Sequence, residues 1–254
     1  MSDEKAAVWT GWRTSPLCGL DTETDGADPE SAHIITATVG IVQGQEGWQP
    51  RSWLLKTDRP IPPAASAIHG ISTEQANREG RDRAEAIAEI AGMVKAAWMA
   101  GSAVVAFNAS FDLTILDREM RRLGIGRLAL DGMVIDPFVI DKAVDPFRRG
   151  SRKLVDVCAH YGIRLDNAHN AGADALAAAR LAWRVAPYLP VAPNDTATST
   201  RLGIIQQQDW HRDQKISLAK YFRTKKGDPD TAADIEAHLD WPIWPATTQE
   251  ETAA

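Results

Sequence analysis

Apolar and polar positions alternate with a period of two in three segments of the first part of the chain. These segments lie near residues 17–22, 33–42 and 48–56 and are separated by glycine-rich turns. Such alternation predicts strands that each bury one face, and short turns between consecutive strands favour an antiparallel meander. Prolines from Pro60 to Pro63 then interrupt the pattern.

The apolar period becomes helical after the meander. A long helix is expected over about 83–99, where Ile87, Ile90 and Val94 share one face. Shorter strands and helices follow, with strands expected at 103–107 and 133–136 and helices at 110–123, 152–161 and 172–187. Three meander strands followed by alternating strands and helices predict an α/β fold, a mixed sheet flanked by helices.

The chain changes character after residue 187. Residues 188–200 are rich in Pro and Thr and predict a linker between a first domain, 1–187, and a C-terminal extension, 201–254. The extension is expected to be helical over 201–225 and again near 231–239, and to carry several tryptophans. It is expected either to dock on the first domain and bury these tryptophans or to serve as an arm that binds a partner.

Composition narrows the class of protein. The chain has 254 residues and a net charge of −6, which argues against a protein that coats nucleic acid. It has no apolar run long enough to span a bilayer, and we expect no N-terminal signal peptide. Cys18 and Cys158 lie in apolar contexts and are expected to be buried thiols rather than a disulfide. We therefore expect a cytoplasmic protein without a membrane partner.

Two carboxylates end the first expected strand. Asp21 and Glu23 follow an apolar run and, two residues apart on a strand, project from one face. Like charges on one face cost stability unless a cation lies between them. Oxygen ligands alone suit a hard ion such as Mg²⁺ or Mn²⁺. The alternative is a solvated turn.

Two later segments place further acids beside helix starts. Asn108 follows the strand at 103–107 as an expected N-cap, which puts Asp112 in the first turn of the next helix. Asp174 lies in the first turn of the helix near 172–187, and His169 lies in the loop before it. Strand ends and helix starts meet where α/β sheets bind ligands, so these side chains are candidates for one site.

These motifs, in this order, resemble the DEDD superfamily of 3′–5′ exonucleases. The match is to its His-containing branch, which includes the epsilon subunit of bacterial DNA polymerase III, because Asn170 stands where the Tyr branch has tyrosine. The resemblance covers roughly residues 15–187. It rests on Asp21 and Glu23, Asn108-x-x-Phe111-Asp112, His169-x4-Asp174, Ile68-His69-Gly70-Ile71, Asp136, and Lys153-Leu154.

The resemblance implies a ribonuclease H-like fold and a two-metal-ion site. Asp21, Glu23, Asp112 and Asp174 would hold two divalent cations, Mg²⁺ or Mn²⁺, and all four would be catalytic. His169 would be the general base that takes a proton from the attacking water. An unperturbed histidine titrates at about 6.5, which suits this role at neutral pH.

The resemblance also implies contacts to the substrate. The backbone around Thr22 and Thr24 and the side chain of His69 would hold the terminal nucleotide, with Asn108 and Phe111 opposite. Two alternatives stay open: His69 as a turn residue before Gly70, and Phe111 as a core residue instead of a surface on which a base stacks.

Arginines and lysines cluster at two places. One group precedes an expected helix and is either a basic rim for nucleic acid or a solvated loop: Arg148, Arg149, Arg152 and Lys153. The other group is expected on the exposed face of its helix: Arg118, Arg121 and Arg122.

The leading hypothesis is a metal-dependent 3′–5′ exonuclease that releases nucleoside monophosphates from single-stranded or frayed DNA 3′ ends, in proofreading or repair. RNA or short oligonucleotides are an alternative substrate. A non-catalytic binding module associated with a polymerase is an alternative of another class. The extension resembles that of an actinobacterial group of small exonucleases and is where a polymerase or replication partner would bind.

Overall fold

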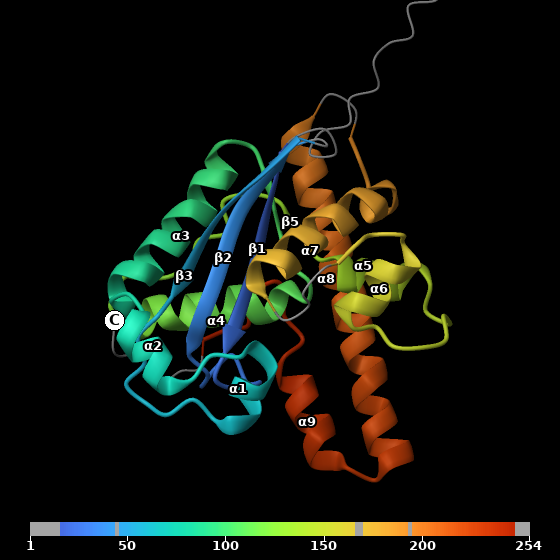
Figure 1. Cartoon of the computed structure of the whole chain (residues 1–254). Coiled ribbons are helices and arrows are strands. Elements are labelled where there is room, and N and C mark those ends of the chain that lie inside the picture. Colours follow the sequence, from blue (N-terminus) through green and yellow to red (C-terminus); the bar gives the residue numbers. More distant parts are fainter. Residues whose placement is uncertain (1–15, 44–45, 166–169, 193–194, 247–254) are drawn as a thin grey trace, which may run out of the picture.

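A five-stranded mixed sheet forms the centre of the computed structural model, which describes residues 16–43, 46–165, 170–192 and 195–246 (Figure 1). The strand order is β3-β2-β1-β4-β5. The antiparallel strands are β1 (Leu17–Thr24), β2 (Ile34–Gln43) and β3 (Glu46–Leu54). The parallel additions beside β1 are β4 (Ala103–Val105) and β5 (Val134–Ile135). The predicted meander and mixed sheet are confirmed.

Helices cover both faces of this sheet. In chain order they are α1 (Pro63–His69), α2 (Thr73–Glu79), α3 (Arg83–Met99), α4 (Ala109–Arg122), α5 (Pro137–Val144), α6 (Leu154–His160), α7 (Ala171–Val185), α8 (Thr196–Tyr221) and α9 (Pro229–Ala237). The alternation along β1 divides the core: Cys18 and Leu20 pack with α3 and α4, whereas Leu17 packs with α7. Figure 1 shows α3 and α7 on opposite sides of the strands.

α7 packs unusually close to β1. A Cβ atom on Gly19 would lie 2.5 Å from the backbone oxygen of Ala175, so no larger residue fits there without displacing α7. This contact brings the first turn of α7 over the end of β1.

Three short helices were not expected from the sequence: α1, α2 and α5. Each has seven or eight residues, too few for a helical period to stand out. α1 and α5 begin at a proline, which is favoured at the first helical position. α8 begins at Thr196, inside the range assigned to the linker, because Asp195 caps it by accepting from Thr198 N.

The C-terminal extension lies against the rest of the protein. α8 packs on α5 and α9, and Trp210 contacts the cores on both sides of the sheet. Trp241 is buried in the core that contains α3 and α4. These contacts agree with the docked arrangement.

The expectation that Arg118 lies on an exposed helix face is wrong. Its side chain is fully buried, because the loop carrying Glu30 and the C-terminal segment cover that face of α4. The guanidinium donates to both oxygens of Glu30 at 2.7 Å and to the backbone oxygens of Trp244 and Pro245. Arg122, by contrast, is exposed.

Cys18 and Cys158 are buried free thiols, as expected. Burial raises their pKa values to about 12 and about 11. In the part of the chain that the structure describes, we find no helix with the length and apolar character that crossing a membrane requires.

Candidate active site

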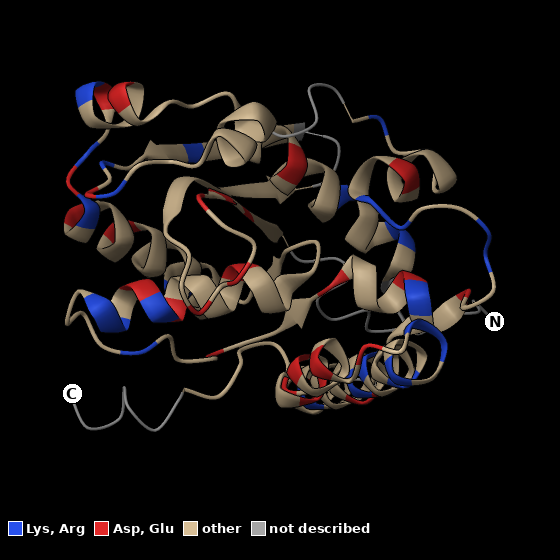
Figure 2. Ribbon diagram, turned by 90° about the horizontal axis from the view of Figure 1, so that it is seen from below, with Lys and Arg blue, Asp and Glu red and all other residues tan. Residues whose placement is uncertain are grey.

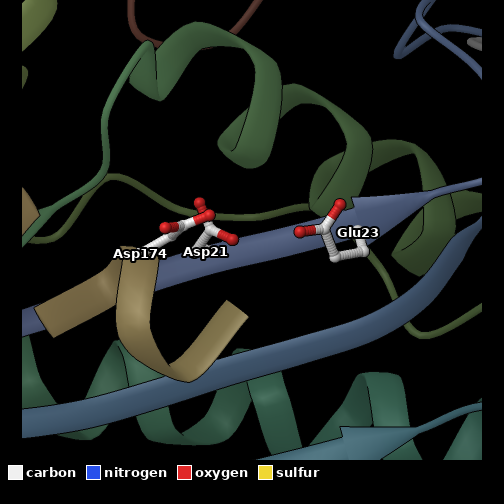
Figure 3. A group of neighbouring side chains, drawn as sticks. All are labelled: Asp21, Glu23 and Asp174. Carbon is white, nitrogen blue, oxygen red and sulfur yellow. The ribbon is translucent and has the colours of Figure 1, made fainter. Parts of the chain in front are cut away.

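Three carboxylates meet where β1 ends and α7 begins. Asp21 and Glu23 project from the same face of β1, and Asp174 lies in the first turn of α7. One oxygen from each lies within 4.8 Å of the others. Figure 3 shows Asp174 facing Asp21, with Glu23 further along the strand.

Asp112 is not one of the three acids that meet, but it lies on the other side of β1, near enough for its charge to raise the pKa of Asp21. It lies in the first turn of α4 and is almost fully buried. Thr22, between the two β1 acids, points the other way and donates from Oγ1 to Asp112 Oδ1 at 2.7 Å. The strand alternation thus links carboxylates from α4, β1 and α7.

Burial and mutual repulsion act on the carboxylates of this site. The pKa of Asp21 is raised well above its ordinary value, first by burial and then by the charges of Asp112, Asp174 and Glu23. Burial also raises the pKa of Asp112 to about 7, although its hydrogen bonds with Thr22 oppose the shift. A divalent cation would reverse both shifts, and the donors are all carboxylate oxygens, so the residues fit a hard divalent ion.

A cavity of about 350 Å³ opens beside Glu23. Its polar lining comes from β1, β2, β3, α1 and the start of α7: Glu23, Thr36, Thr38, Ser52, His69 and Asn170. Thr38 and Ser52 face each other on β2 and β3, with their hydroxyl oxygens 2.8 Å apart. Sequence reasoning did not identify Thr38 or Ser52, because strand register could not be read from the alternation alone.

His69 lies in this cavity with a defined tautomer. Its Nδ1 accepts from Ile71 N at 3.1 Å, so the neutral ring carries its proton on Nε2. Burial lowers the pKa of His69. The ring is therefore neutral at neutral pH, and its Nε2 atom is buried near the backbone of Thr24.

The other residues predicted to contact the substrate differ in their exposure and in their hydrogen bonds. Thr24 donates from Oγ1 to the backbone oxygen of Gly26, and Phe111 is half-buried at the start of α4. Asn108 occupies the N-cap position of α4 and is exposed, but its side chain does not cap the helix. The expected N-cap position of Asn108 is confirmed, but the residue adopts a left-handed conformation, and the carboxylate of Asp136 accepts the N–H of Ala109.

His169 lies outside the described residues, so its assignment stays a prediction. The adjacent Asn170 is described and caps α7, since its Oδ1 accepts from Gly172 N and Ala173 N.

The predicted basic rim divides into two pairs. Arg148 and Arg152 both donate to the buried carboxylate of Asp141, at 2.5 and 2.6 Å, and thus stabilise the loop itself. Arg149 and Lys153 are exposed. In Figure 2, Lys and Arg are interspersed with Asp and Glu over the helices, and no helix in that view carries basic residues alone over most of its length.

The chain belongs to the exonuclease family RNase_T, whose profile matches residues 18–182. This match contains the three carboxylates, Asp112 and the cavity residues described above. Residues 18–182 are thus an exonuclease domain, and α8 and α9 lie beyond it.

Two curated proteins are similar to this chain. A DNA polymerase III subunit epsilon-like protein of Rhodobacter capsulatus is 33% identical over 176 residues, which cover 67% of this chain and 23% of that protein. DNA polymerase III subunit epsilon of Treponema pallidum is 30% identical over 159 residues, covering 61% of this chain and 69% of that protein. The chain thus spans about a quarter of the first relative.

Exonuclease I of Escherichia coli has a similar fold. Its complex with a dT13 oligonucleotide superposes with a TM-score of 0.57 and 21% identity, covering 67% of this chain and 41% of that one. A zinc-bound complex of the same enzyme with single-stranded DNA gives a TM-score of 0.56. These similarities confirm the ribonuclease H-like exonuclease fold.

Proposed function

We propose that the protein is a metal-dependent 3′–5′ exonuclease that releases nucleoside monophosphates from DNA 3′ ends. The observation that carries this proposal is the group of Asp21, Glu23 and Asp174, with oxygens within 4.8 Å, beside a cavity of about 350 Å³. Membership of the exonuclease family supports the reaction class. The relatives' names as polymerase subunits and the DNA bound to exonuclease I support DNA as the substrate.

Asp21, Glu23, Asp112 and Asp174 would hold two divalent cations, Mg²⁺ or Mn²⁺. When bound, such ions supply a nucleophile near neutral pH and stabilise charge on phosphoryl oxygens. Thr22 holds the carboxylate of Asp112 in place through its hydroxyl.

Two histidines have separate tasks in this proposal. The neutral imidazole of His169 accepts the proton of the attacking water. His69, with its proton on Nε2, donates to an oxygen of the terminal nucleotide. The backbone near Thr22 and Thr24 lies on one side of that nucleotide and the start of α4, with Asn108 and Phe111, on the other.

The proposal also covers the cellular location of the enzyme, its partner and its substrate. We place the enzyme in the cytoplasm, in proofreading or repair, with a polymerase as its partner. RNA is the second candidate substrate, because the same four acids would serve either nucleic acid.

A matched pair of variants tests the activity. The parent should release labelled mononucleotides from a 3′-labelled DNA strand only when Mg²⁺ or Mn²⁺ is present, and faster than from an RNA strand of the same sequence. Asp21→Asn should abolish release, whereas Asp156→Asn, at an exposed acid on α6, should leave it unchanged. Equal activity in both variants would contradict the proposed site, and faster cleavage of RNA would favour the second substrate.

A further inference from the structure

β5 is the outer strand of the sheet, and α8 covers its open edge. The inner side of β5 bonds to β4, so the backbone oxygen of Val134 and the backbone N–H of Asp136 face outward. Gln207 of α8 satisfies both: its Nε2 donates to Val134 O at 2.9 Å, and its Oε1 accepts from Asp136 N at 2.8 Å. The side chain of Gln207 thus makes the two hydrogen bonds that a sixth strand would make with this edge of β5.

Gln207 is built into this position. Its side chain is fully buried, and Nε2 also donates to Gly203 O at 3.0 Å. A buried amide whose donor and acceptor atoms are both bonded holds one orientation, because any rotation would leave polar atoms unpaired. The edge of β5 is therefore fixed by α8.

Asp136, which follows β5 directly, connects this edge to the start of α4. Its Oδ1 accepts from Asn108 N at 3.0 Å and its Oδ2 from Ala109 N at 2.9 Å. Trp241 of the C-terminal segment donates to the same Oδ2 at 3.3 Å. Burial raises the pKa of Asp136 to about 6, and these N–H groups oppose the shift.

The two bonds to Asp136 maintain a strained turn. Asn108 has φ 70° and ψ 52°, and among the described residues it is the one non-glycine residue with positive φ. A residue with a Cβ atom enters this region at a cost in free energy. The turn directs the chain from β4 into α4, so that Asp112 arrives one helical turn later beside Thr22.

The C-terminal segment around Trp241–Pro245 also forms hydrogen bonds with α4 beyond the first turn of this helix. Trp244 N donates to Thr114 Oγ1 at 3.0 Å, and Arg118 donates to Trp244 O at 3.0 Å. Gln208 of α8 holds the segment by donating to Trp241 O at 3.0 Å. The helix that carries Asp112 is thus in contact with the extension over about two turns.

We propose that the C-terminal extension positions Asp112 in the metal site, with Gln207, Trp241 and Asp136 as positioning residues. The inference rests on the proposed function, since it assigns the extension to the same site. An exonuclease domain without this extension would have to hold the start of α4 in another way.

Two substitutions separate positioning from general stability. Gln207→Leu removes the amide that bonds the β5 edge, and Trp241→Phe removes one N–H while keeping an aromatic ring in the core. Both should weaken Mn²⁺ binding by about tenfold and lower kcat by a similar factor, as changes to the partners of metal ligands do, with KM for single-stranded DNA unchanged. Amide hydrogen exchange should also become faster at residues 108–112.

Val94→Ala is the matched control, because it truncates a fully buried side chain of α3. It should lower Tm but leave Mn²⁺ affinity, kcat and exchange at 108–112 at parental values. If Gln207→Leu and Trp241→Phe behave like this control, the extension is only a structural support and the inference is overturned. Mn²⁺ titration and hydrogen exchange do not require cleavage, so a parent protein that fails to degrade DNA would overturn the proposed function alone.

Discussion

Asp112 is the residue of the site in which burial and charge repulsion can be tested most directly. Its carboxylate is almost fully buried and lies close enough to other acids to raise the pKa of Asp21. Burying several acids together costs stability, and proteins keep such groups where function requires their charge. A bound divalent cation would relieve the repulsion between these acids, so the proposed function couples the charge state of the site to its metal ions.

Asp112→Asn should therefore stabilise the metal-free protein at high pH. The folded pKa of about 7 exceeds the ordinary value of 3.8. Between these values the folded state keeps a proton that the unfolded state has lost, so stability falls as pH rises through this window. At pH 8 in a chelator, the variant should gain about 1–3 kcal/mol in free energy of unfolding, and at pH 4 nothing.

Urea unfolding at the two pH values measures this effect. Asparagine keeps an oxygen that accepts from Thr22, so the comparison isolates the charge. With saturating Mn²⁺ the order should reverse, because only the parent binds the ion fully. A variant less stable than the parent at pH 8 in chelator would show that the carboxylate is not repelled by its neighbours.

His169 can be separated from the metal ligands by its variants. His169→Ala should lower kcat by about 10²–10⁴-fold, the usual effect of losing a general base, while both ions stay bound. His169→Gln should have the same low rate, since an amide can orient water but cannot take its proton. Single-turnover rates combined with Mn²⁺ calorimetry check this. Loss of an ion in His169→Ala would move His169 into the ligand set, and near-parental rates would remove it from the mechanism.

The position of helix α4 could be predicted from the sequence, but the burial of its arginine could not. Its position and the placement of Asp112 in its first turn followed from the apolar period and a strand end. The burial of Arg118 did not, because periodicity in one segment reports a polar face but not what later covers it. The cover comes from Trp244 and Pro245, more than 120 residues further along the chain.

In other elements, too, local sequence patterns could be predicted, whereas features that depend on distant contacts could not. β1 was predictable because an apolar run precedes Asp21 and Glu23, and α3 because Ile87, Ile90 and Val94 recur at helical spacing and are all buried. α5 was not, because it has only eight residues, and Asp136, which caps it, had been named as part of the family resemblance. The group of Asp21, Glu23 and Asp174 could be proposed from strand ends and helix starts, whereas the pairing of Thr38 with Ser52 required the register of two strands.

Arg118→Met should destabilise the protein strongly. The arginine is fully buried and compensates Glu30 and Asp117. Its removal takes the donor from the half-buried carboxylate of Glu30 and from the backbone oxygens of Trp244 and Pro245, while Asp117 keeps its bond from Arg121. Removing one partner of a buried ion pair typically costs about 3–5 kcal/mol. Arg121→Met is the comparison, since Arg121 reaches the same Asp117 at 2.7 Å from a partly exposed position and should cost at most about 1 kcal/mol. Equal losses of urea stability would contradict the structural role assigned to Arg118.

Across the whole molecule, the cavity beside Glu23 is the feature that would limit which nucleic-acid ends react in the proposed function. It opens between the edge of the acid group and α1, with about 350 Å³ of space, which suits one nucleotide rather than a base pair. If the enzyme acts as proposed, a paired 3′ terminus would have to unpair and unstack before its phosphodiester reaches Asp21. That step costs about 1.4 kcal/mol per base-pair step, or about tenfold in rate.

Single-stranded and mismatched 3′ ends should thus be degraded about tenfold faster than matched duplex ends, and terminal A·T faster than terminal G·C. The physical reason is the cost of fraying, so the preference should shrink as temperature rises and terminal pairs open on their own. Single-turnover rates on a single strand and on three duplexes that differ only in the last pair (mismatch, A·T or G·C) measure this, with a 5′-labelled strand showing the ladder of shortened products. A bulky group on the 3′ hydroxyl should stop the reaction, because it cannot enter beside His69. Equal rates on paired and unpaired ends would show that the enzyme opens the duplex itself, and products released from the 5′ end would contradict the polarity.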